Sequence, residues 1–168
     1  MSYLADEESI TAGDKMKVNI LTYLSTGKFG EVGLGTQLDE ALKLLGEPAR
    51  RDEMDKPEKV NILSYNRFSA NFGGKGSLYV MSLVFDNYSA PLSASIQLEG
   101  PQLTEKTTSE EMEKLLKDAG VKYEADVTDY SVTLKTVSKV EVQTVKDEAS
   151  GKFLLQSIGI NDFAYMWK

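Results

Sequence analysis

The segment from Gly30 to Pro48 constrains the fold most, because it encodes one short helix together with both of its ends. Thr36 is a preferred N-cap residue, and Asp39 follows three residues later, where an acidic side chain can complete a capping box. Leucines at helical spacing give the segment one apolar face: Leu38, Leu42 and Leu45. Gly46 permits a left-handed turn after the last leucine, and Pro48 prevents the helix from continuing. The sequence therefore predicts a short amphipathic helix that packs against another layer.

The second half of the chain follows a similar plan. Thr108 and Glu111 form a capping box before a helix that Gly120 ends. The apolar face of this helix comprises Met112, Leu115, Leu116 and Ala119. After each helix the pattern predicts about four strands, at 60–65, 67–72, 78–85 and 92–98 in the first half, and at 121–125, 130–136, 139–145 and 153–160 in the second. An earlier helix over about 15–25, capped by Asp14 and closed by Gly27, is predicted as well. The charged run 50–59 is interpreted as a solvated loop.

These patterns predict an α+β fold, because the antiparallel strands occur in consecutive runs and the helices are segregated from them. We interpret the chain as a tandem duplication of a helix, or helix-loop-helix, packed on an antiparallel sheet of about four strands. Residues 1–13 are expected to be a mobile lead-in, 14–100 the first helix-plus-sheet unit and 101–168 the second. The two units are expected to join near residues 99–107, with Thr36 and Thr108 as equivalent N-caps.

Composition excludes several classes of chemistry. The 168 residues contain no cysteine and no histidine, which rules out disulfides, thiolate metal sites and catalysis by serine–histidine or cysteine–histidine pairs. The net charge of −7 disfavours nucleic acid as a partner. No apolar run is long enough to span a membrane, and the acidic start lacks a signal pattern. We expect a cytoplasmic protein without cofactor or metal; a secreted chain whose signal has been removed is the alternative.

The segment from Leu21 to Pro48 resembles the signature of the beta-lactamase inhibitory protein-like folds, which include the SmpA/OmlA outer-membrane assembly lipoproteins. The matching positions are Gly33, Gly35, Thr36, Leu38, Leu42, Leu45, Gly46 and Pro48. Residues 26–30 also resemble a group of uncharacterised small bacterial cytoplasmic proteins with the same helix-loop-helix opening. The resemblance implies a fold in which a helix-loop-helix and four strands occur twice. It transfers no inhibitor residues, and the disulfides and the lipidation cysteine of these families are absent here.

Motifs with chemical potential have simpler structural interpretations. The glycines at 30, 33 and 35 lack the strand and the Gly-Lys-Ser/Thr of a phosphate loop, and 73–76 is typical of a hairpin tip. Acidic clusters occur at 52–55, 110–113, 124–129 and 147–148, in turns or in the first turn of a helix, where acids are favoured. An enzyme that uses carboxylate, lysine or tyrosine is the alternative. The aromatic segment 162–168 is either tucked against the fold or free to dock a partner.

One set of polar residues is expected to face away from the core, because strand side chains alternate. If both sheets have helices on one side only, their other sides form one open polar surface. The candidate protein-binding residues on it are Ser93, Ser95, Gln97, Thr133, Lys135, Glu141, Gln143 and Gln156. The structural alternative is an ordinary solvated sheet face. The functional hypothesis is a non-catalytic inhibitor or immunity-type protein that blocks another protein, such as a toxin or an enzyme; a scaffolding or assembly module is the alternative.

Overall fold

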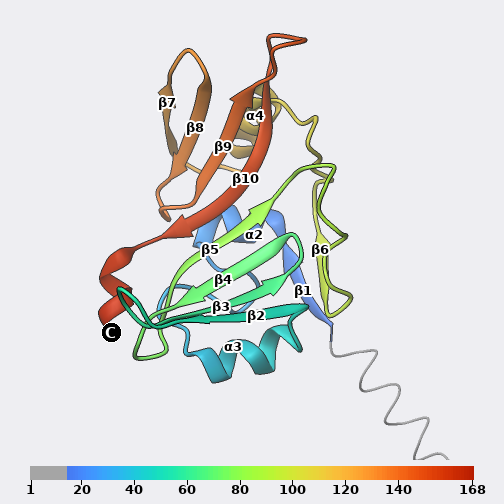
Figure 1. Cartoon of the computed structure of the whole chain (residues 1–168). Coiled ribbons are helices and arrows are strands. Elements are labelled where there is room, and N and C mark those ends of the chain that lie inside the picture. The colour runs from blue at the N-terminus through green and yellow to red at the C-terminus, as the bar shows by residue number, and fades with distance from the viewer. Residues whose placement is uncertain (1–14) are drawn as a thin grey trace, which may run out of the picture.

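An antiparallel sheet of eight strands dominates the computed structural model, which describes residues 15–168 (Figure 1). The predicted lead-in at 1–13 and the predicted cap Asp14 lie outside the described residues. The strand order is β2-β3-β4-β5-β10-β9-β8-β7. The strands are β2 (Arg50–Met54), β3 (Val60–Tyr65), β4 (Phe68–Phe72), β5 (Leu78–Val84), β7 (Tyr123–Val127), β8 (Ser131–Thr136), β9 (Glu141–Lys146) and β10 (Phe153–Asn161). The α+β prediction is thus confirmed.

The two runs of four consecutive strands meet at a single seam. There β5 and β10 pair antiparallel, from Val84 opposite Ser157 to Val80 opposite Asn161. Strands of both halves are therefore continuous in one sheet, although the strand predicted at 92–98 is not part of it. The strands of the two runs lie at a wide angle to one another in Figure 1, as the twist between neighbouring strands accumulates across the sheet.

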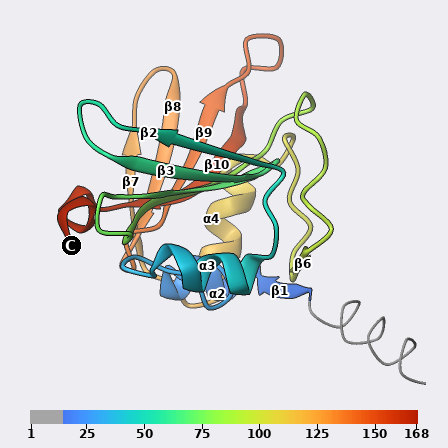
Figure 2. The ribbon, with the colours of Figure 1, turned by 60° about the horizontal axis from the view of Figure 1, so that its bottom comes forward.

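The helices lie on one side of this sheet. They are α2 (Ile20–Thr26), α3 (Leu38–Leu45) and α4 (Ser109–Asp118). α2 and α4 lie behind the sheet in Figure 1, and Figure 2 places all three helices on the same side. The residues at the core are the helix-facing members of the inner strands, such as Leu63, Ala70 and Leu134, none of which is exposed. A short 3-10 helix, η1 (Phe163–Trp167), follows β10 and packs against β5.

The predicted N-cap of α4 is confirmed, whereas that of α3 is wrong. Thr108 Oγ1 accepts from the Glu111 N–H at 3.2 Å, and the Glu111 carboxylate accepts from the Thr108 N–H at 3.1 Å. The N-cap of α3 is Gln37, and Thr36 Oγ1 instead accepts from the N–H of Gly33 at 3.0 Å. The N–H of Leu38 donates to the Gly76 carbonyl at 2.8 Å. The hairpin that follows β4 thus satisfies a helix-end donor that a cap would otherwise serve.

Removing the confirmed cap gives a testable loss of stability. We expect Thr108→Ala to lower the free energy of unfolding by about 1 kcal/mol, because alanine lacks the Oγ1 atom that accepts from the Glu111 N–H. Thr108→Ser keeps the hydroxyl and is the matched control, with an expected change of a few tenths of a kcal/mol. Urea unfolding followed by circular dichroism measures both. Equal losses in the two variants would contradict the capping role.

The prediction of one helix over 15–25 is wrong for its first part and confirmed for its second. Its first part is strand β1 (Met16–Asn19), which pairs parallel with β6 (Ile96–Glu99) in a separate two-stranded sheet. Only the second part is the helix α2, capped by Asn19 and closed by Gly27 with φ of 77°, as predicted for that glycine. Met16 and Val18 are buried in alternation, which suits a strand. Pairing with residues far along the chain therefore overrides the local helical pattern.

The charged run predicted as a loop is partly a strand. Its first five residues form β2, paired along its whole length with β3. Four of these five side chains are charged, and no apolar alternation marks the segment. The charge nevertheless suits its place, because β2 is an edge of the sheet and charged side chains are a common feature of edge strands.

Candidate interaction surface

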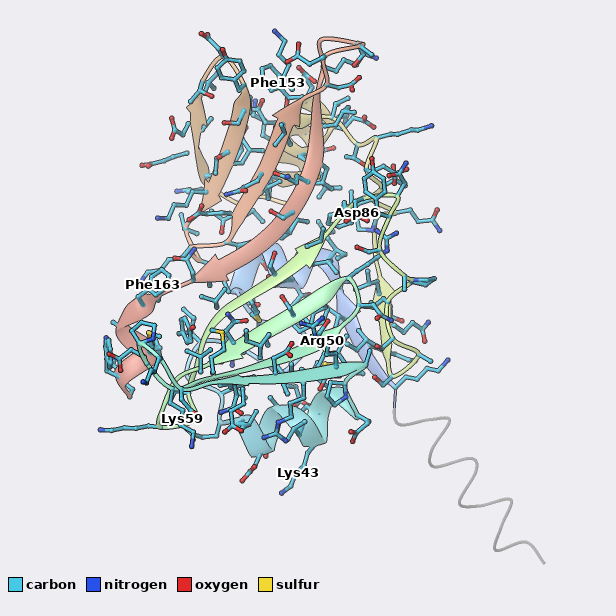
Figure 3. The ribbon with its side chains drawn as sticks, in the orientation of Figure 1. Lys43, Arg50, Lys59, Asp86, Phe153 and Phe163 are labelled. Atoms are coloured by element: carbon cyan, nitrogen blue, oxygen red, sulfur yellow. The ribbon has the colours of Figure 1, made fainter. Side chains whose placement is uncertain are left out.

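The face of the eight-stranded sheet that points away from the helices is the candidate site. None of the helices in residues 15–168 lies over it, and Figure 3 looks onto it from the front. Strand registers place one outward-facing residue from every strand in a single row across the sheet. From β7 to β2 the row is Glu124, Lys135, Glu141, Gly159, Ser82, Ser69, Ser64 and Arg50. We call this surface the open face.

Five of the candidate residues predicted from the sequence lie together on the second half of the sheet. Lys135 of β8 is opposite Glu141 of β9, and Thr133 is opposite Gln143. Their neighbours Val132, Leu134, Val142 and Thr144 are buried. Alternation therefore points the four polar residues to the open face, as predicted. Gln156 is exposed at an irregularity of β10, where the register with β9 shifts between Leu155 and Ser157.

The other three candidates, Ser93, Ser95 and Gln97, are not in the large sheet, which corrects the expected common surface. Residues 92–95 form no strand, and β6 pairs with β1 instead. Ser95 Oγ is buried without a hydrogen-bond partner among residues 15–168, and its side chain lies against Gly46. Gln97 is exposed opposite Lys17. The apolar and polar alternation at 92–98 indicated a strand but carried no information on its partner.

Sequence reasoning missed the first-half residues that occupy the open face. These are the half-buried outward residues Ile62, Ser64, Ser69, Asn71, Val80, Ser82 and Val84. A signal for them existed in β4, where Phe68, Ala70 and Phe72 are buried and the intervening Ser69 and Asn71 are not. The middle of the open face thus combines serine and asparagine side chains with the apolar residues Ile62, Val80 and Val84.

Charge is unevenly distributed over the open face. On the β7 side, Lys135 lies between Glu124 and Glu141 in cross-strand register, and Asp126 is opposite Thr133. On the β2 side, Arg50 Nε pairs with Asp52 Oδ2 at 2.7 Å. Carboxylates therefore outnumber cationic side chains at the β7 side, where the face is acidic, whereas Arg50 and Asp52 balance each other at the β2 side.

The perturbed titratable groups act as structural hydrogen-bonding groups. Burial, together with the hydrogen bond to Glu113 and the charge of that residue, raises the pKa of Tyr123 to about 12. Its hydroxyl donates to Glu113 Oε1 at 2.8 Å, which ties β7 to α4. Hydrogen bonds from the backbone of Ser89 lower the pKa of Asp86, whose carboxylate holds the loop after β5. A tyrosine with a raised pKa stays protonated at neutral pH and serves as a donor, not as a base.

A hollow lies away from the open face, between β1, α2 and α3. It has a volume of about 780 Å³, and its charged lining residues are Lys15, Lys17, Lys43, Glu31 and Glu99. Gly30 also lines it, with φ of 66° and the Met16 side chain directly against its Cα, so this glycine serves loop geometry. Within residues 15–168, Asp and Glu side chains form no cluster of three that could hold a metal ion. Nor does any helix there have the length and apolar character to cross a membrane.

The C-terminal η1 packs beside the sheet. Tyr79 of β5, which is 5% exposed, contacts the ring of Phe163 at a centroid distance of 5.7 Å. Gly73 leaves no room for a Cβ atom, because such an atom would lie 2.8 Å from the carbonyl carbon of Met166. Phe163 and Trp167 remain 61% and 57% exposed, so the segment is both packed and partly accessible.

Comparisons of the chain with protein-family models, curated protein sequences and solved structures found no match.

Proposed function

We propose that this chain is a non-catalytic protein-binding module of the inhibitor or immunity type, which blocks another protein, such as a toxin or an enzyme, through its open face. The observation that carries the proposal is a sheet of eight strands with the helices of residues 15–168 on one side only. A hydrogen-bonded sheet backed by a core holds its side chains in fixed positions, which lowers the entropic cost of binding a large surface. The acidic composition and the absence of histidine and cysteine accord with a binding role in the cytoplasm.

The arrangement of the strands also supports a tandem duplication of the beta-lactamase inhibitory protein-like kind. Each run of four strands follows a helix, α3 before β2 to β5 and α4 before β7 to β10. The last strand of each run, β5 and β10, forms the seam. We therefore keep 14–100 and 101–168 as two units of one repeated plan. The strands β1 and β6 belong to the first unit alone.

The acidic β7 side of the open face favours a partner with a basic surface. Attraction between opposite charges accelerates association and weakens as salt is added. We expect one dominant partner, captured from the native host and released by salt, if the protein inhibits a single target. Several partners captured together by the same face would instead favour the scaffolding alternative.

Charge reversal on the open face tests the proposal. We expect Glu141→Lys to weaken capture of the partner by at least about tenfold, which corresponds to about 1.4 kcal/mol. The variant also places a lysine opposite Lys135, and like charges in register cost about 0.2–1 kcal/mol of stability. The double variant Lys135→Glu/Glu141→Lys restores an opposite-charge pair between β8 and β9. Titration of immobilised protein with the captured partner gives the affinity, and urea unfolding gives the stability.

The control is Lys106→Glu, which changes one exposed charge in the connection before α4. It should capture the partner as the wild type does. If Glu141→Lys and the double variant both retain wild-type affinity, the open face is a solvated surface and the proposal fails. The exposed aromatic residues of η1 then become the better candidate.

A further inference from the structure

The two edges of the eight-stranded sheet differ in how well they are protected against pairing with another strand. The β2 edge carries charges of both signs, with Arg50 paired to Asp52, Glu53 3.9 Å from Lys59, and Pro48 shortly before it. Mixed charge and proline are devices that keep an edge from adding a strand. The β7 edge has no lysine, arginine or proline within its five residues, Tyr-Glu-Ala-Asp-Val, and its register with β8 is unbroken.

The backbone of β7 presents regularly spaced groups along this edge that have no partner within the described part of the chain. The Thr128 N–H donates to Ser131 and the Lys122 carbonyl accepts from Val137, so even-numbered residues exchange hydrogen bonds with β8. In an antiparallel pair the intervening residues point their N–H and C=O groups the other way. Tyr123, Ala125 and Val127 therefore direct their backbone donors and acceptors outward, and among the strands of residues 15–168 only β8 lies beside β7.

The side chains of β7 fix the chemistry that an added strand would meet. On the helix side of the sheet, Ala125 and Val127 are exposed, Val127 by 65%, although their register partners Leu134 and Val132 are buried. On the open face, Glu124 and Asp126 are both acidic and both exposed. Apolar surface on one side and negative charge on the other call for a strand that alternates apolar and basic residues.

We propose that β7 accepts an extended segment of a partner protein as a ninth strand, with lysine or arginine facing Glu124 and Asp126 and apolar side chains covering Ala125 and Val127. Main-chain hydrogen bonds supply affinity in this mode, and alternating side chains supply specificity. A second copy of the chain is a poor occupant. Antiparallel pairing of two β7 strands about Ala125 would place Glu124 opposite Asp126 twice, and like charges in register are destabilising.

The probe is the capped hexapeptide Lys-Val-Lys-Val-Lys-Val, titrated into the full chain labelled with nitrogen-15. We expect the amides of Tyr123, Ala125 and Val127 to shift and to become protected from hydrogen exchange, while the amides of β2 stay unchanged. The comparison peptide Lys-Lys-Lys-Val-Val-Val has the same composition and charge but cannot present alternating faces. It should bind at least about tenfold more weakly and protect none of the three amides.

Three variants separate backbone pairing from simple charge attraction. Ala125→Pro removes an outward N–H without touching the bonds to β8, and should abolish binding. Glu124→Lys/Asp126→Lys should weaken binding at least about tenfold, whereas the matched variant Asp55→Lys/Glu58→Lys, with the same change in net charge, should bind almost normally.

If Ala125→Pro does not fold, the charge variants and the hydrogen-exchange data decide whether the proposal holds. Equal binding of both peptides, normal binding by Glu124→Lys/Asp126→Lys, or a dimer of the free chain would each overturn the proposal. If the β7 edge binds no peptide, the proposal for the open face is still decided by the Glu141→Lys experiment alone.

Discussion

Replacing Phe29 by alanine lowers the free energy of unfolding by about 3–5 kcal/mol. Phe29 is fully buried in the loop between α2 and α3. Its ring stacks on Phe68 of β4, with centroids 3.8 Å apart and planes 6° apart, and meets the edge of Tyr23 of α2 at 5.4 Å. One side chain thus joins a helix, a loop and the sheet. Its removal leaves a cavity that three separately anchored segments cannot easily close.

Urea unfolding of Phe29→Ala and Phe29→Leu measures this effect. Leucine keeps most of the apolar volume of phenylalanine. Apart from the contribution of the lost ring contacts, Phe29→Leu should therefore lower the free energy of unfolding by less than about 1.5 kcal/mol. Phe163→Ala serves as the control for aromatic removal at an accessible position, because Phe163 is 61% exposed. A loss below about 1 kcal/mol for Phe29→Ala would mean that the loop repacks, and that it does not tie α2 to the sheet.

Elements specified by local signals were predicted well. The helix after Thr108 and strand 60–65 lie where the sequence placed them, because caps, terminating glycines and turns act within a few residues. The predicted strand 78–85 corresponds to β5, which lies inside the sheet, with Val80 and Val84 half-buried on the open face.

Elements that depend on distant partners were not predictable. β1 carries a helical pattern, and only its parallel register with β6, with Val18 opposite Leu98, makes it a strand. β2 has almost no apolar residues and becomes a strand because β3 offers its free edge. In both cases strand pairing decides the structure, and a pattern confined to one segment cannot reveal its partner.

The candidate site was predicted in part, for the same reason. In β8 and β9 the apolar residues Val132, Leu134 and Val142 each lie between polar neighbours, so Thr133, Lys135, Glu141 and Gln143 could be assigned to one face. The residues around Ser95 alternate too, but the chain leaves the large sheet after β5. The joining of the two halves through β5 and β10 also had no local signal. The first-half side chains of the open face were therefore missed.

The seam between β5 and β10 yields the second large effect. Gly159 lies on the open face in the middle of the seam, opposite Ser82. A Cβ atom at this position would lie 2.9 Å from the Met81 carbonyl oxygen and 3.3 Å from Ser82 Oγ. The first of these neighbours is backbone held in the sheet, so it cannot move aside without disturbing strand pairing. We expect Gly159→Val to lower the free energy of unfolding by about 1–3 kcal/mol, because overpacking forces the backbone to shift.

Intrinsic preference predicts the opposite sign for this substitution, since valine favours strands and glycine weakens them. The experiment therefore separates the strand preference of valine from the close approach of β5 and β10 at Gly159. Gly74→Ala is the matched control: its Cβ would meet nothing nearer than 3.8 Å and its backbone requires no positive φ, so stability should stay the same or rise by up to about 1 kcal/mol. Urea unfolding of both variants decides the matter. If Gly159→Val is as stable as the wild type or more so, the close approach of the strands at the seam does not constrain this residue. If it is less stable, the continuity of the open face depends on a glycine where the two halves of the sheet meet.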